Sequence, residues 1–380
     1  MRSLIFLTPV LLSFSCFSHD YKQFDSYQNK ISKETIQYRI DHYLQNDPQI
    51  NNHYELDEDK FFVYSTVENK LNNRPLYVLK LGKDEKITPL IGLKGKKIAI
   101  DPGHFGGNLA YLEERFVNMQ EPYNVSFNEG TLTLCTALFL KKMLEDAGST
   151  VMLTKEKLSE GVYPENFFLW LQSQSHLWKK STQLNQLFRD YYNRLDLKSR
   201  AQKINDWQPD IAIIIHYNAY DDRLPNSSKT KATDVNCNMV FIPGAFSKKE
   251  IEDVDGLFHF TRLLIEPTIE KSKALADALI TSFSKTLDVL VPDDSINAPY
   301  LKKVCIQANP GVYCRNLILT RLVKCPLAYG ETLVQNNSKE CLLLADTSLE
   351  IEGIKTSARV REVAQSYFIG IQHYFGDVDN

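Results

Sequence analysis

An unbroken apolar run at residues 211–215, Ile-Ala-Ile-Ile-Ile, most constrains what this chain can fold into. A strand with one solvated face alternates apolar and polar residues, so a run without alternation indicates a strand covered on both faces. Strands of this kind belong to parallel sheets, whose crossover connections place helices against each face. The run therefore predicts an α/β domain.

The segments on either side of this run continue the pattern from residue 97 onward. Leucines with Phe139 and Met143 at helical spacing predict a helix at 130–147, and Gly148 can take the left-handed conformation that ends a helix. Further strands are predicted at 98–100, 150–154, 239–242 and 327–329, and further helices at 191–206, 271–287 and 358–375. This alternation predicts a mostly parallel, twisted sheet with helices on both faces.

Residues 19–92 lack this alternation and are predicted to form a small α+β region ahead of the domain at 93–380. Apolar residues at helical spacing predict a helix at 32–44, and a hairpin of two strands is predicted at 61–66 and 75–81. We interpret the region as a spacer or packing module, or else as an element that docks a partner.

Residues 1–18 have the features of an export signal. Arg2 supplies a positive start, residues 4–12 are largely apolar, and Ser15 is a small residue suited to cleavage. The apolar stretch is too short to span a bilayer as a mature helix. Cys16 permits the alternative of lipid attachment, and only in that case is a membrane expected as a partner. Either interpretation predicts a periplasmic or cell-envelope protein.

Six cysteines remain beyond Cys16, and an even number in an exported chain permits disulfides. Cys305 and Cys314 are close in sequence and are the pair to test first. The alternative is that the six are buried free thiols, which pack as small apolar residues.

The charge of the chain argues against one class of partner. The formal net charge is −3 and no long run carries a single sign, so the basic field typical of nucleic-acid binding is absent from the sequence. We therefore expect no nucleic-acid partner.

Histidines and a carboxylate follow directly after three of the predicted strands. His104 lies in a turn after strand 98–100, His216 ends the run at 211–215, and Glu331 follows strand 327–329. Because ligands of such folds gather at the carboxyl ends of the strands, these side chains are expected to meet at one edge. Two imidazoles and a carboxylate form a zinc set that leaves a position for water, and a further carboxylate can take the proton of that water.

The third member of the zinc set is predicted to be Glu129, at the start of the helix that continues through 130–147. An acidic residue is also expected there because of the helix dipole. Glu113, Glu114 and Glu121 in the preceding segment compete for the role. Glu129 is preferred because a helix start is rigid.

Four segments in this order resemble the zinc-dependent N-acetylmuramoyl-L-alanine amidases (amidase type 3) of the bacterial cell wall. Residues 96–104 resemble their first zinc motif, Glu129 their glutamate ligand, 210–219 their second histidine motif, and 326–331 the strand with their catalytic glutamate. The resemblance covers residues 93–377.

The resemblance implies that His104, Glu129 and His216 hold Zn²⁺ and that Glu331 is the general base and acid. The implied substrate is peptidoglycan, cut at the amide between the lactyl group of N-acetylmuramic acid and L-alanine. Two alternatives stay open: a zinc peptidase that cuts peptide bonds of peptidoglycan, and a non-catalytic wall-binding protein. Glu331 argues against the latter, because a binder has no use for a fourth carboxylate.

The chain departs from the family pattern at several places. Phe105 stands where the family usually has glycine, Lys155 stands where it commonly has arginine, and extra length falls near 158–190 and 222–268. The first insertion is interpreted as a helical pair that packs on the domain or forms a wall of the substrate groove.

The second insertion carries an acidic stretch and an apolar stretch within residues 245–268. Some cell-division amidases have a helix here that plugs the active site until an activator protein removes it. The hypothesis is that this segment is such a plug, and the alternative is a solvated acidic loop.

Overall fold

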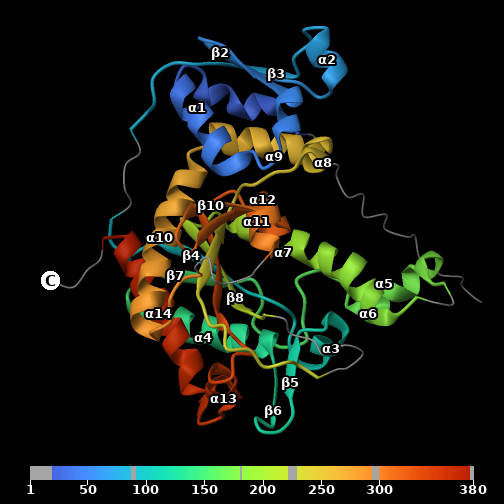
Figure 1. Cartoon of the computed structure of the whole chain (residues 1–380), viewed down its shortest axis with the longest axis vertical. Helices are drawn as coiled ribbons and strands as arrows, with labels where there is room; N and C mark the ends of the chain where they lie inside the picture. The colour runs from blue at the N-terminus through green and yellow to red at the C-terminus, as the bar shows by residue number, and fades with distance from the viewer. Residues whose placement is uncertain (1–18, 87–90, 180–181, 221–228, 293–298, 377–380) are drawn as a thin grey trace, which may run out of the picture.

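The computed structural model describes residues 19–86, 91–179, 182–220, 229–292 and 299–376. A seven-stranded sheet with the order β10-β11-β9-β12-β8-β4-β7 forms its centre (Figure 1). The neighbours β10–β11 and β9–β12 are antiparallel and the other neighbours are parallel. The bounds are β4 (Lys97–Pro102), β7 (Thr150–Leu153), β8 (Ile211–Asn218), β9 (Met239–Ile242), β10 (Cys305–Asn309), β11 (Val312–Arg315) and β12 (Leu327–Val334). The predicted mostly parallel sheet is confirmed.

Helices cover both faces of this sheet, as the composition of β8 requires. Alternate residues of β8 enter two different hydrophobic clusters: Ile211, Ile213 and Ile215 pack with one set of helices, and Ala212 and Ile214 pack with the other. The first set is α4 (Glu129–Asp146), α10 (Thr268–Leu287) and α14 (Ala358–Tyr374), and the second is α7 (Asn193–Trp207) and α12 (Ile318–Leu322).

Helix α4 begins and ends where its sequence predicts. The side chain of Asn128 accepts a hydrogen bond from the Thr131 amide at the first turn, and Gly148 follows the last turn with φ +88°. This cap fixes the point at which Glu129 leaves the loop and enters the helix.

Shorter elements connect and extend this framework. They include the hairpins β5 (Phe116–Met119)–β6 (Val125–Asn128) and β13 (Leu349–Ile351)–β14 (Ile354–Thr356), and the short helices η4 (Gly107–Leu109), α3 (Ala110–Glu113), α11 (Pro299–Val304) and α13 (Glu340–Ala345). The β5–β6 hairpin lies between His104 and Glu129 in the chain.

The N-terminal region is α+β, as predicted. The expected helix at 32–44 appears as α1 (Lys33–Arg39) continued by a wider turn, η2 (Ile40–Leu44). Strand β2 (Lys60–Val63) pairs antiparallel with β3 (Tyr77–Lys80), with α2 (Val67–Leu71) in their connection, and β1 (Tyr54–Leu56) adds a third strand. The short helices η1 (Tyr21–Tyr27) and η3 (Pro48–His53) complete it.

The insertion at 245–268 packs against this N-terminal region. It forms α8 (Lys248–Ile251) and α9 (Val254–Ile265), and α9 lies between the N-terminal elements and the rest of the molecule (Figure 1). Phe258 contacts Tyr21 and Phe24, with ring centroids 5.5 Å apart in both pairs. The buried guanidinium of Arg39 donates to the carbonyl of Leu264 at 2.6 Å and pairs with Glu270.

The hypothesis that this segment plugs the active site is therefore wrong. The alternative of a solvated acidic loop holds only in that Glu252, Asp253 and Asp255 are exposed. Every residue from 256 to 265 is buried. Helix α9 contacts η1, α1, η2 and α8, and its Arg262 also donates to the carbonyls of Arg321 and Val323 on the other side. Composition alone did not distinguish a plug from a packing helix, because both need an apolar face.

Substitution of Leu263 tests this packing role. Leu263 is fully buried in α9, so Leu263→Ala is expected to lower the free energy of unfolding by about 2–5 kcal/mol, measured by urea denaturation. Val254→Ala on the same helix is the matched control, because Val254 is 68% exposed, and its effect should stay within about 0.5 kcal/mol. Equal, small effects of the two changes would contradict the packing role.

The insertion near 158–190 is helical, as predicted, with α5 (Phe167–Ser173), η5 (Ser175–Leu177), α6 (Leu184–Leu187) and η6 (Phe188–Tyr192). Its buried aromatic residues pack around Phe105, whose ring centroid is 5.0 Å from that of Phe188. Since Phe105 directly follows His104, the insertion supports the turn that carries this histidine. The role as a wall of the substrate groove stays a prediction.

The cysteines in the described part of the chain are free thiols. In the β10–β11 hairpin, Cys305 is opposite Arg315 and Ile306 is opposite Cys314. Because successive side chains point to opposite faces of a sheet, Cys305 and Cys314 lie on opposite faces and cannot bond. The suggested disulfide is therefore wrong, and the alternative of buried thiols holds for all but the half-buried Cys325.

The predicted export signal at residues 1–18, including Cys16 as the alternative lipidation site, lies outside the described residues. Among the residues that are described, no helix has both the length and the apolar character to cross a bilayer.

Candidate metal centre

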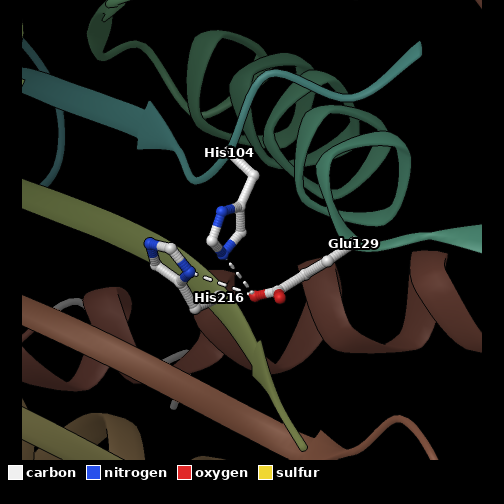
Figure 2. A group of neighbouring side chains, drawn as sticks. All are labelled: His104, Glu129 and His216. Carbon is white, nitrogen blue, oxygen red and sulfur yellow. Dashed lines mark hydrogen bonds and ion pairs between the residues drawn. The ribbon is translucent and has the colours of Figure 1, made fainter. Parts of the chain in front are cut away.

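Three predicted site residues meet at the carboxyl edge of the sheet. His104 follows β4, Glu129 opens α4, and His216 lies near the end of β8 (Figure 2). Strands β4 and β8 are parallel and their pairing ends at Pro102 and Ile215, so the next residues bring the two histidines side by side. The predicted convergence at one edge is confirmed.

The donor atoms of this group are close and buried. Glu129 Oε1 lies 3.1 Å from His104 Nε2 and 3.1 Å from His216 Nδ1, and all three ligand atoms lie within 4.8 Å of one another. Bonds of about 2.0–2.1 Å in a tetrahedral zinc site imply ligand separations of roughly 3.3 Å. Two imidazole nitrogens and one carboxylate oxygen at these separations fit zinc.

Glycines make this approach of the chains feasible. A Cβ on Gly103 would lie 2.4 Å from the ring of His216, and a Cβ on Gly130 would lie 2.2 Å from the amide nitrogen of Gly106. Real side chains do not tolerate such distances, so Gly103 admits the histidine ring and Gly130 admits the loop against the start of α4.

The charges of the group are tightly coupled. Burial opposes ionisation of Glu129, but the neighbouring His104 and His216 outweigh it and hold the pKa of Glu129 well below its usual range. Burial and then the charge of His104 lower the pKa of His216 to about 4, so His216 is neutral, the form in which imidazole binds metals. Burial also lowers the pKa of His104, but the charges of Glu129 and Glu113 outweigh this effect and raise the pKa to about 9.

Glu331 is a neighbour of the group of ligand atoms but does not belong to it. It is directly opposite His216 in the parallel pair β12–β8. Burial, followed by the charge of Glu129, raises the pKa of Glu331 to about 8. A carboxyl group with a raised pKa can both accept and donate a proton near neutral pH.

The three competing glutamates take other positions. Glu113 is buried and contacts the Nδ1 atom of His104, on the opposite side of the ring from Glu129. Glu114 pairs with Arg189 at the surface, and Glu121 accepts a hydrogen bond from Asn124. The structure thus brings Glu129, and none of these three, into the group of ligand atoms.

Comparison with known proteins decides the family. The model of the family Amidase_3, described as N-acetylmuramoyl-L-alanine amidase, matches residues 98–359. The chain belongs to this family. The match includes Glu129, residues 210–219 and residues 326–331, and it includes the first segment from residue 98 onward. No match to a curated protein was found.

Solved structures with similarity to this family member include three amidases. The CwlD amidase from Clostridioides difficile, in complex with the GerS lipoprotein, is 20% identical (75% of this chain, 100% of that chain, TM-score 0.44). Ami1 from Mycobacterium smegmatis is 15% identical (76% and 100%, TM-score 0.43). The catalytic domain of CwlV from Bacillus (Paenibacillus) polymyxa var. colistinus is 18% identical (75% and 99%, TM-score 0.41).

Two residues of this Amidase_3 member that sequence reasoning missed hold the ligand group in place. The ring of Tyr329 stacks on that of His216, with centroids 4.5 Å apart and planes at 6°. Gln335 donates to Glu129 Oε2 at 3.2 Å and to the Tyr217 carbonyl at 3.1 Å. Tyr329 could have been found from the sequence, because it lies two residues before Glu331 on one strand and such residues lie on the same face of the sheet. No comparable spacing relates Gln335 to the predicted site residues.

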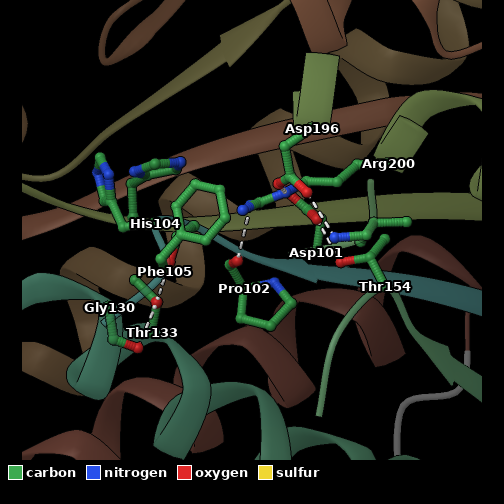
Figure 3. Close-up of polar contacts among 12 residues, drawn as sticks. Asp101, Pro102, His104, Phe105, Gly130, Thr133, Thr154, Asp196 and Arg200 are labelled. Carbon is green, nitrogen blue, oxygen red and sulfur yellow. Dashed lines mark hydrogen bonds and ion pairs between the residues drawn. The ribbon is translucent and has the colours of Figure 1, made fainter. Parts of the chain in front are cut away.

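A buried charge cluster lies behind the ligand group (Figure 3). Arg200 on α7 donates to Asp196 at 2.7 Å and to the carbonyl of Pro102 at 3.2 Å, and its guanidinium lies 3.6 Å from Asp101. The hydroxyl of Thr154 donates to the other oxygen of Asp101. This cluster fixes the end of β4, from which His104 departs.

Proposed function

We propose that this chain is a zinc-dependent N-acetylmuramoyl-L-alanine amidase that acts on peptidoglycan. The observation that carries the proposal is the buried group His104, Glu129 and His216, whose donor atoms have spacings that suit zinc, at the strand edge within the segment that matches the family. Zinc bound there supplies a Lewis acid that polarises a carbonyl group and acidifies water.

The roles of the protein groups follow from their positions. His104, Glu129 and His216 hold the metal, and Gln335 and Tyr329 restrict the movement of Glu129 and His216. Glu331 accepts the proton of the attacking water and donates it to the leaving amine. The water oxygen forms a bond with the lactyl carbonyl carbon and the C–N bond breaks, so the products are a lactyl carboxylate and a stem peptide with a free L-alanine amine.

We also propose that the protein works outside the cytoplasm, because its proposed substrate is there and residues 1–18 have the composition of an export signal. An activator that removes a plug at 245–268 is not part of this proposal, since that segment is a packing element.

Product analysis tests the function. We expect the mature protein to release stem peptides that begin at L-alanine from isolated sacculi, as identified by mass spectrometry. Release should stop when zinc is removed with a chelator and return when zinc is added back.

Fragments cut between two amino acids would instead establish a peptidase. Sacculi that bind the protein but release nothing, with zinc present, would favour a wall-binding protein.

A further inference from the structure

Glu113 has no role in the proposed reaction, yet it contacts both the ring of His104 and the amide of Phe105. It ends the short helix α3 and is buried, with 4% of the residue exposed. Its Oε1 lies 2.8 Å from His104 Nδ1, and its Oε2 accepts a hydrogen bond from the Phe105 amide at 3.0 Å. One carboxylate therefore contacts both the ring of a candidate ligand and the next peptide group.

The ring contact defines which nitrogen of His104 is free for a metal. His104 Nε2 faces Glu129 Oε1 at 3.1 Å, whereas Nδ1 faces Glu113. An ionised carboxylate only accepts hydrogen bonds, so it selects the tautomer in which Nδ1 carries the proton and the Nε2 lone pair is available. A carboxylate at the second nitrogen also fixes the ring orientation and makes the histidine a stronger ligand.

The amide contact acts on the backbone of the same turn. His104 has φ +59°, in the left-handed region that is disfavoured for residues other than glycine. The hydrogen bond from the Phe105 amide to Glu113 holds the peptide that directly follows this residue. The ring and the strained backbone of His104 are thus fixed by the same side chain.

Burial would raise the pKa of Glu113, but the neighbouring His104, the Phe105 amide and then Lys155 lower it to about 2. The Lys155 ammonium lies 5.8 Å and the Arg200 guanidinium 5.2 Å from the centroid of the Phe105 ring. The Nζ atom of Lys155 is buried and has no hydrogen-bond partner within the described part of the chain. Burial and then the charge of Arg200 lower the pKa of Lys155 to about 7, so this lysine, which stands where arginine is common in the family, is only partly charged at neutral pH.

We propose that Glu113 is a positioning residue that sets the tautomer and orientation of His104 and thereby strengthens zinc binding. The proposal rests on the proposed function in one respect, namely that zinc is the metal held by this group. The sequence allowed Glu113 as a direct ligand, and the structure assigns it to the nitrogen that faces away from the ligand group.

The test measures zinc affinity, with Glu113→Gln as the variant and Glu114→Gln as the matched control. Glutamine has nearly the same shape but lacks the charge and one acceptor oxygen, so we expect the zinc Kd of E113Q to rise by about 10–100-fold in competition with a chromophoric chelator. E114Q, which removes a surface carboxylate one residue away, should stay within about twofold of the wild type.

Three further readouts separate positioning from a general structural role. The absorption spectrum of the cobalt-substituted protein should change in E113Q and not in E114Q, because only Glu113 contacts a proposed metal ligand, the ring of His104. E113D, which keeps the charge, should regain part of the zinc affinity. Ring-nitrogen NMR of the zinc-loaded wild type should show the proton of His104 on Nδ1, and this measurement needs no variant to fold.

The outcomes distinguish this proposal from the proposed function. A folded E113Q that binds zinc as tightly as the wild type, or a His104 whose Nδ1 carries no proton, overturns the role of Glu113 alone. A wild-type protein that binds no zinc overturns the zinc mechanism, and this role with it.

Discussion

Glu331→Gln is expected to lower kcat by about 10²–10⁴-fold while the protein keeps its zinc. Glu331 lies opposite His216 on the neighbouring strand, and it is not one of the three residues whose ligand atoms form the metal group. The amide of glutamine cannot take a proton from water, so the loss falls on the chemical step. Release of stem peptides from sacculi measures the rate, and metal analysis of the same sample measures zinc.

Glu350→Gln is the control for this prediction. Glu350 is an exposed carboxylate on strand β13, which pairs with β14 in a hairpin outside the central sheet. Its rate should equal that of the wild type. If zinc-loaded E331Q turned over at the wild-type rate, the general base would have to be another residue.

Arg200→Met is expected to have the largest effect on stability. Arg200 is 1% exposed and lies between Asp101 and Asp196, whose side chains are fully buried. Methionine fills similar space but leaves two buried carboxylates without their cation, so the free energy of unfolding should fall by about 3–5 kcal/mol in urea denaturation.

Arg194→Met on the same helix is the matched control, since Arg194 is exposed, and its effect should stay within about 0.5 kcal/mol. If Arg200→Met lowered the free energy of unfolding as little as the control does, the prediction would be wrong. The attraction within the ion pairs would then only offset the cost of desolvating their charges.

The framework of the fold was predictable because its signals are local. The run at 211–215 has no polar face, and the structure divides it between two hydrophobic clusters, as a strand covered on both sides requires. His104, His216 and Glu331 were predictable for a related reason: each follows an apolar run, and neighbouring strand ends converge on one edge.

Features that depend on distant contacts were not predictable in this way. Nothing in the segment between His104 and Glu129 indicated that Glu113 would contact the outer ring nitrogen, because that depends on where α3 folds back. Cys305 and Cys314 suggested a pair by proximity in sequence, whereas the register of β10 and β11 puts them on opposite faces. The apolar stretch of α9 gave no sign that its partner would be the N-terminal region.

The packing of that region against α9 sets an order for folding during synthesis. Arg39 and the carbonyl of Leu264 that it binds are separated by 225 positions in the chain. At roughly 5–20 residues per second, the ribosome needs on the order of 10–45 s to synthesise the intervening segment. During that time Phe24, Ile36 and Ile40 have no α9 to pack against. The proposed export in an unfolded form would avoid this wait, because both partners would be complete before either must fold.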